Sequence, residues 1–228
     1  RPRFLVGLVS LILSLLYCFP IFVTWCNWGI RDWDQHFFYL EVPRLTVTNY
    51  HQFPLWNPYY CGGFPMLANP QSRVLAPTFF LYPLLGTVAA SKIDIILHVF
   101  VGVVGAYYLA RMHGVSKISS LAVMAVAMLN GFYAHALTAG MPPFLSISYV
   151  PWLIIGVAKS RRDLRFMWVS GAILAIMFLD GGHYTVVLAA MFVGVYYLIE
   201  AVCQRSWRPL FLAAGVIVIC FGLAAVKF

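Results

Sequence analysis

Residues 74–86 read VLAPTFFLYPLLG, an apolar stretch that either crosses a membrane or lies along its surface. A helix needs about 20 apolar residues to cross the hydrocarbon core. This stretch is shorter and contains Pro77 and Pro83, which interrupt a helix. We therefore expect a re-entrant or interfacial helix. The choice decides on which side of the membrane every later loop lies.

The composition is that of a membrane protein. Hydrophobic residues make up 62% of the 228 residues and charged residues only 10%, whereas soluble domains average about 45–50% and about 25%. We predict an all-α polytopic membrane protein in which residues 1–228 form a single transmembrane domain. About seven transmembrane helices are expected, near residues 4–25, 93–110, 118–137, 143–158, 166–180, 184–201 and 209–227.

The basic residues orient these helices. If 74–86 does not cross, ten of the fifteen Lys and Arg residues share the side of the N-terminus, including those of KSRRDLR (159–165). Since Lys and Arg are enriched in cytoplasmic loops, we expect a multi-pass protein of the cell inner (plasma) membrane with a cytoplasmic N-terminus. The chain starts at Arg1 without a methionine and stops in an apolar run, so we expect a piece of a longer protein.

This orientation creates one long outer loop, residues 26–92. We expect a helix over 33–45, then a chain of turns over 49–73, because prolines and the Gly62-Gly63 pair favour specified turns over helix or sheet. The loop is either a lid that rests on the membrane or a direct substrate contact, and the sequence leaves both open. Five of the seven acids fall on this outer side: Asp32, Asp34, Glu41, Asp94 and Asp180.

Two aspartates stand at the start of the expected loop helix. Asp32 and Gln35 form a pattern similar to a capping box, in which the Asp carboxylate binds backbone N–H groups. Asp34 lies in the first turn and is not needed for capping, so we interpret it as the functional carboxylate. We expect Glu41 to pair with Arg44.

Further candidates lie near the same boundary. In FLDGGHYTVV (178–187), Asp180 and His183 flank a tight Gly-Gly turn at the outer membrane boundary. Ionisable groups at this depth indicate function, although the two side chains could simply pair with each other or cap helix ends. His135 is a weaker candidate at a helix end. Arg73 precedes the interfacial segment at a height that suits a lipid phosphate.

Cysteine and histidine spacing gives no metal site. No Cys/His pattern resembles that of a zinc site, so no metal ligand is predicted. Cys26 and Cys61 both fall in the outer loop, where oxidising conditions could join them, and the sequence does not decide whether they do.

The stretch PLWNPYYCGGFPMLANPQS (54–72), after an early loop Asp and before a Gly-His turn, resembles the corresponding part of C-type (GT-C) membrane glycosyltransferases, closest to bacterial YfhO-like membrane proteins. The resemblance implies transfer of a sugar from a polyprenyl-phosphate donor to a glycan or lipid acceptor on the outer face. It assigns the catalytic role to Asp34, with Asp32 second. No certain cofactor is implied, although a divalent metal is possible. Substrate-binding candidates are His183, Asp180, Arg73, Trp56, Asn57 and His135.

Two other functions remain open. A lipid-linked-substrate transporter or flippase would place polar groups near the bilayer midplane, whereas here they gather at one face. A non-catalytic membrane scaffold could share the fold, because fold does not fix function. We expect no nucleic-acid partner, since the basic residues stand in short clusters between apolar runs.

Overall fold

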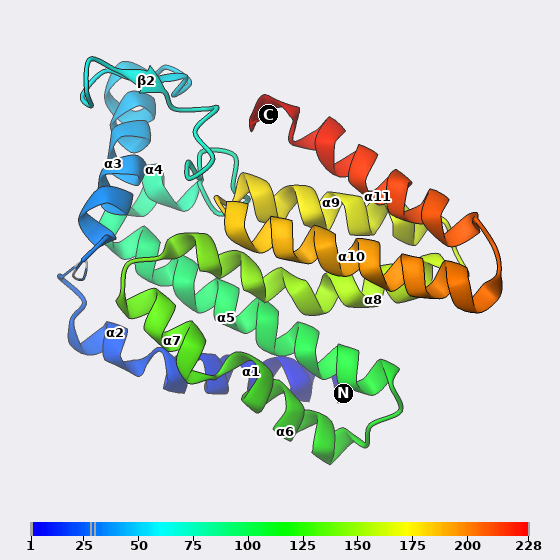
Figure 1. Cartoon of the computed structure of the whole chain (residues 1–228). Helices are drawn as coiled ribbons and strands as arrows, with labels where there is room; N and C mark the ends of the chain where they lie inside the picture. Colours follow the sequence, from blue (N-terminus) through cyan, green and yellow to red (C-terminus); the bar gives the residue numbers. More distant parts are fainter. Residues whose placement is uncertain (1, 28, 30, 228) are drawn as a thin grey trace.

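The chain folds into a helical bundle with a small loop domain at one end (Figure 1). This computed structural model describes residues 2–27, 29 and 31–227, and it is mostly helical, as expected. The α-helices are α1 (Pro2–Tyr17), α2 (Phe19–Val23), α3 (Trp33–Tyr50), α4 (Leu81–Leu85), α5 (Thr87–Met112), α6 (Lys117–Met128), α7 (Gly131–Thr138), α8 (Val150–Ser160), α9 (Arg165–Leu179), α10 (His183–Gln204) and α11 (Arg208–Leu223). The 3-10 helices are η1 (Pro142–Tyr149) and η2 (Ala225–Lys227), and the strands are β1 (Trp56–Asn57) and β2 (Phe64–Pro65).

Four helical segments are long and apolar enough to cross a membrane, which indicates a membrane protein. They are Thr87–Met112, Lys117–Thr138, Pro142–Ser160 and His183–Gln204. Three shorter apolar helices accompany them: Phe4–Tyr17, Arg165–Leu179 and Arg208–Leu223. Every predicted span therefore contains an apolar helix, but only four reach spanning length.

The stretch 74–86 does not form a spanning helix. It consists of turns followed by the five residues of α4, which rise only about 8 Å at 1.5 Å per residue. Tyr82 is the anchor of this helix, because its side chain is almost completely buried. The structure thus agrees with the expectation that 74–86 is not a spanning helix.

Two helix boundaries differ from the ends of the predicted spans. The first run, 4–25, breaks after Tyr17 because Pro20 lies near the start of α2 and cannot continue the preceding helix. α5 begins at Thr87 instead of residue 93, since Lys92 and Asp94 are buried inside it with partners rather than exposed in a loop.

Two more differences concern local structure. The span predicted at 118–137 divides at Asn130, whose side chain caps α7 by accepting a hydrogen bond from the Tyr133 backbone N–H at 2.9 Å. The segment 49–73 is not made of turns alone, because Trp56 pairs with Pro65 and Asn57 with Phe64 in a short antiparallel hairpin. The cross-strand backbone bonds hold an otherwise proline-rich loop in one shape.

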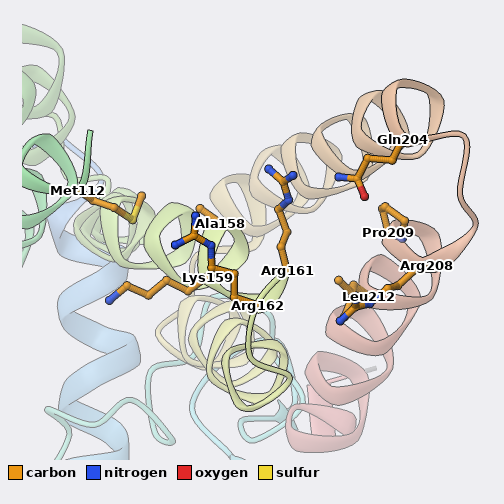
Figure 2. A pocket seen from close by; sticks show the side chains of 9 residues that line it. All are labelled: Met112, Ala158, Lys159, Arg161, Arg162, Gln204, Arg208, Pro209 and Leu212. Carbon is orange, nitrogen blue, oxygen red and sulfur yellow. The ribbon is translucent and has the colours of Figure 1, made fainter. Parts of the chain in front are cut away.

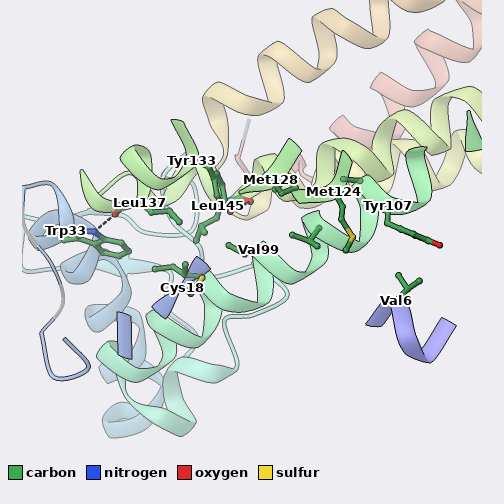
Figure 3. Close-up of a cluster of buried hydrophobic side chains, with 13 residues drawn as sticks. Val6, Cys18, Trp33, Val99, Tyr107, Met124, Met128, Tyr133, Leu137 and Leu145 are labelled. Carbon is green, nitrogen blue, oxygen red and sulfur yellow. Dashed lines mark hydrogen bonds between the residues drawn. The ribbon is translucent and has the colours of Figure 1, made fainter. Parts of the chain in front are cut away.

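The bundle has two cores. One joins α1, α5, α6, α7 and η1 (Figure 3), and the other joins α8, α9, α10 and α11. Small residues allow close packing, as in other membrane bundles: a Cβ on Gly171 of α9 would lie 2.6 Å from the Ile219 side chain of α11. Helix α3 and the hairpin project from one end (Figure 1) and share a small core of their own.

Candidate functional site

Four ionisable side chains form a buried cluster at the end of the bundle near α4, which we call the charged cluster: Arg73, Asp94, His98 and Asp180. Arg73 Nη1 lies 2.7 Å from Asp94 Oδ2, and its Nη2 lies 2.5 Å from Asp180 Oδ1. His98 bridges the same carboxylates, with Nδ1 3.0 Å from Asp94 Oδ1 and Nε2 2.9 Å from Asp180 Oδ2. All four side chains are at most 4% exposed. The cluster is therefore a closed ring of alternating positive and negative partners.

Three parts of the chain meet in this ring. Asp94 and His98 are four residues apart on α5 and so share one face of the helix. Asp180 ends α9, and Arg73 follows the hairpin loop. The turn after Asp180 packs closely on that loop, since a Cβ on Gly181 would lie 3.1 Å from the Gln71 carbonyl oxygen. The cluster thus ties the loop to two separate helices.

Two tyrosines complete the ring. The Tyr82 hydroxyl of α4 donates to Asp94 Oδ2 at 2.9 Å, and the Tyr149 hydroxyl of η1 lies 3.2 Å from His98 Nε2. Burial raises the pKa of the Tyr82 hydroxyl well above its ordinary value, and the Asp94 charge raises it further. Tyr82 therefore stays a hydrogen-bond donor across the physiological range.

The electrostatics favour the charged form of the arginine. Burial by itself would lower the pKa of Arg73, but the Asp180 and Asp94 carboxylates outweigh it and hold the pKa well above its ordinary value. A buried ion pair of this kind is costly to break, because the remaining charge has no water to solvate it. Arg73, predicted to bind a phosphate, already directs its nitrogens at two carboxylates of the protein.

Lys227, in the short 3-10 helix η2 that follows α11, closes the cluster. Its Nζ donates to the carbonyl oxygens of Phe178 at 3.1 Å and Leu179 at 3.2 Å, and to that of Ser72. Burial lowers the pKa of this amine to about 8, against the opposing effect of the Asp180 carboxylate. The lysine fastens the hairpin loop to the end of α9.

The start of α3 lies at the same end of the molecule. The Trp33 indole N–H donates to the Leu137 carbonyl oxygen at 2.8 Å (Figure 3). Gly140 fits directly beneath this turn, since a Cβ there would lie 2.3 Å from the Trp33 backbone nitrogen. The chain from α7 to η1 therefore fixes where α3 begins.

The predicted capping box at Asp32 was wrong. Asp32 is the residue before α3, but its backbone is helical and its side chain makes no capping hydrogen bond within the part of the chain that the structure describes. Gln35 does not reach back either; its Nε2 donates to the Tyr39 hydroxyl at 2.8 Å. Asp32 and Asp34 are both exposed, so both carboxylates are open to solvent.

The pKa of His36 indicates which of the predicted residues lie near one another. The pKa of its imidazole is lowered to about 4, mainly by burial and also by the Arg73 and His183 charges, while the Asp32 charge opposes the shift. Such effects require these charges to lie within electrostatic range of the imidazole. Asp32, Arg73 and His183 therefore lie within electrostatic range of His36, a residue that no sequence pattern indicated.

Other predicted residues lie apart or are buried. Asp180 pairs with Arg73 and His98 rather than with His183, whose Nδ1 lies 3.0 Å from the Gly181 carbonyl oxygen. Asn57 is completely buried in β1. Trp56 and His135 are exposed, and neither has a described contact to the charged cluster.

Two further expectations concern the outer loop. The predicted pair forms, with Arg44 Nη2 2.5 Å from Glu41 Oε1. Hydrogen bonds from Arg44 lower the pKa of the Glu41 carboxyl despite partial burial. Cys26 and Cys61 are free and exposed.

An open, mainly apolar cavity of about 290 Å³ lies beside the start of α3. Its wall includes Trp33, Ile21 and Leu137, and the buried Lys92 supplies its only ionisable group among the described residues. Lys92 Nζ donates to the Thr24 carbonyl oxygen and lies 5.7 Å from the centre of the Trp25 ring. An apolar cavity with one cation suits an amphiphilic anion.

No metal centre is apparent. Among the described residues, no three His, Cys, Asp or Glu side chains form a group that could hold a metal ion. We therefore derive no step through a metal.

Comparison with known proteins found no matching family, no matching curated relative and no matching solved structure.

Proposed function

We propose that this protein is an integral-membrane glycosyltransferase of the GT-C type, which transfers a sugar from a polyprenyl-phosphate donor to a glycan or lipid acceptor on the outer face of the plasma membrane. The observation that carries the proposal is the apolar cavity with Lys92 in its wall, which is also lined by Trp33, the residue that follows the exposed Asp32 in the chain. The proposal includes about seven membrane-spanning helices and a cytoplasmic N-terminus.

The cavity suits the donor chemically. Apolar walls favour the polyprenyl chain, and an ammonium group favours the phosphate, which leaves as an anion when the sugar is transferred. An ammonium group has three N–H donors, and one of those of Lys92 is used by the Thr24 carbonyl. The others can bind phosphate oxygens.

The acceptor hydroxyl needs a base, because its own pKa lies far above 7 and it must lose a proton as the new bond forms. Asp34 remains the predicted base. Asp32 is the second candidate, and its charge acts on the imidazole of His36. Asp34 is two positions from His36 and thus on a different face of α3.

The buried residues have a positioning role in this proposal. Arg73 and Asp180 hold the turn that carries His183 against the hairpin loop. The aromatic cavity of about 490 Å³ beside Tyr39, Tyr60 and Phe64 in that loop offers ring faces to a sugar.

The three short apolar helices support seven crossings. α1, α9 and α11 pack within the same bundle as the four longer segments. Their shortness can be accommodated by local thinning of the bilayer. Orientation follows from the basic residues, as the sequence analysis argues.

The test compares Asp32→Asn, Asp34→Asn and Lys92→Gln in the full-length protein, assayed in membranes for transfer of a lipid-linked sugar. Asp163→Asn is the matched control, because Asp163 is an exposed aspartate in the α8–α9 connection. We expect one Asp variant to lose transfer while expression is unchanged, and Lys92→Gln to weaken donor binding. Normal transfer in all variants would overturn the proposal and favour a flippase, detectable as donor movement between leaflets, or a scaffold.

A further inference from the structure

Another cavity lies at the opposite end of the bundle, about 460 Å³ in volume (Figure 2). Helix α9 connects the two ends, since it begins at Arg165 near this cavity and leads to Asp180 in the charged cluster. Figure 2 shows Arg161 and Gln204 on facing sides of the space, with Arg208 on the side of α11. The lining residues are Met112, Ala158, Lys159, Arg161, Arg162, Gln204, Arg208, Pro209 and Leu212.

The lining is strongly cationic. It contains four positive side chains and no carboxylate. Among the described residues, only Arg161 of these four has an acidic partner, Glu200, at 2.9 Å. The nearby Asp163 carboxylate instead accepts a hydrogen bond from the Arg165 backbone N–H. Three cations at one cavity therefore lack a counter-charge within the described chain.

The cations are presented by helix ends. Lys159 lies in the last turn of α8, where its Nζ is 5.1 Å from the centre of the Phe166 ring. Arg162 follows in the α8–α9 connection, and Arg208 begins α11 directly before Pro209. Because short turns connect these helices, the guanidinium groups approach one space from different elements.

The surroundings place this cavity at the level of lipid headgroups. Four large apolar side chains are exposed around it on the same helix ends: Leu164 at 56%, Trp168 at 63%, Trp207 at 76% and Phe211 at 73%. Exposed Trp rings at the ends of apolar helices are typical of the membrane interface. A groove of about 330 Å³ with an apolar lining that includes Val202 and Leu210 runs between α10 and α11 beside the cavity.

We propose that this basic cavity binds the headgroup phosphate of an anionic phospholipid from the adjacent leaflet, with an acyl chain along the α10–α11 groove. Basic pockets between membrane helices recognise anionic headgroups through charge and hydrogen bonds. Arg162 and Arg208 provide paired guanidinium donors that match phosphate oxygens. The apolar flanks select a lipid over free phosphate. The site is independent of the proposed transferase reaction at the other end.

The test measures thermal unfolding of the purified full chain in neutral detergent. Dihexanoyl phosphatidylglycerol, dihexanoyl phosphatidylcholine and inorganic phosphate are each titrated in a separate series. We expect saturable stabilisation by the anionic lipid alone. In Arg162→Gln/Arg208→Gln its apparent affinity should fall about thirtyfold, because about 1 kcal/mol per cation gives about 2 kcal/mol for the two and about 1.4 kcal/mol is tenfold. The matched control is Lys117→Gln/Arg165→Gln, which removes the same charge from exposed positions outside the cavity and should bind normally.

Each other outcome overturns the proposal. Equal stabilisation by both lipids means that the cations only orient the chain in the membrane. Equal stabilisation by inorganic phosphate means that the ligand is a free anion. An equal loss in the control variant means that net charge, and not this cavity, attracts the lipid. If the double variant does not fold, Arg208→Gln alone and the lipid selectivity of the unchanged chain still decide.

Discussion

The two ends of this bundle differ in whether their charged side chains have partners of opposite charge in the protein. In the charged cluster, Arg73, Asp94, His98 and Asp180 are buried and bind one another. At the basic cavity, four cations are exposed and have one acidic partner among the described residues, Glu200. At the first end the counter-charges are side chains of the protein. At the second end most counter-charges must come from solvent ions or a ligand.

This difference has an energetic reason. A charge removed from water is stable only when a partner of opposite sign and enough hydrogen bonds replace the lost hydration. A charge at the membrane surface stays hydrated and needs no partner in the protein. Charged residues at the first end therefore determine the fold, while those at the second are available for a ligand.

The largest effect is expected from Arg73→Met. The substitution leaves the Asp94 and Asp180 carboxylates buried without their strongest partner, so we expect a loss of about 3–5 kcal/mol in unfolding free energy. Thermal or denaturant unfolding in detergent measures it. Arg162→Met at the basic end should change stability by about 0.5 kcal/mol or less. Equal losses at both ends would remove the distinction between them.

Two glycines provide a comparison of backbone packing. Gly140 and Gly114 have nearly the same backbone angle, φ +81° and +79°, but a Cβ meets the Trp33 backbone at Gly140 and open space at Gly114. Gly114→Ala should cost about 1–2 kcal/mol for the left-handed backbone. Gly140→Ala should cost about 1–3 kcal/mol more, because the start of α3 must move. Similar unfolding midpoints for the two variants would show that this contact is loose.

His36 makes the outer end sensitive to pH. Its pKa is lowered from 6.5 to about 4, so the folded state keeps a neutral imidazole where the unfolded chain binds a proton. No stability is lost above about pH 6.5, and the loss grows as the pH falls toward 4, to about 3 kcal/mol. The free energy of unfolding is measured at about pH 7.5 and about pH 5. Between these two pH values it should fall less in His36→Gln than in the wild type.

The exposed His135 provides the control for this comparison. His135→Gln should keep the full acid sensitivity of the wild type, because its side chain is not held away from water. If His36→Gln and the wild type lose the same stability at acid pH, another group is responsible, and His36 is not the acid-sensitive element of the outer end.

Much of the fold could be predicted from local sequence. The short length and the prolines of 74–86 correctly indicated that it does not form a long helix, and apolar runs located the helices. The start of α5 could not be found this way, because Lys92 and Asp94 are charged and resemble loop residues until their distant partners are known. Asn130 was a readable helix cap inside an apolar run that we interpreted as continuous.

The residues of the candidate site could likewise be predicted only in part from local sequence. Arg73, Asp180 and His183 were selected because charged residues at a membrane boundary are rare. His98 is not marked by any motif, although its spacing of four from Asp94 on one helix predicts a shared face. No local pattern could reveal that Arg73 completes the ring. Asp32 shows the opposite error, since a local capping pattern was present and the helix did not use it.

The smallest effect is expected at the Arg161–Glu200 pair, the one acidic contact of the basic cavity. The two groups are 2.9 Å apart, but the arginine side chain is 44% exposed, so water and salt screen the attraction. A double-mutant cycle with Arg161→Gln and Glu200→Gln should give a coupling energy of about 0.2–1 kcal/mol, falling as salt is added. Glu200 also accepts a hydrogen bond from Gln204. The Glu200→Gln variant should therefore lose slightly more unfolding free energy than the Arg161→Gln variant. A coupling above about 2 kcal/mol would mean that the pair is effectively buried, and that the basic end holds its charges as the charged cluster does.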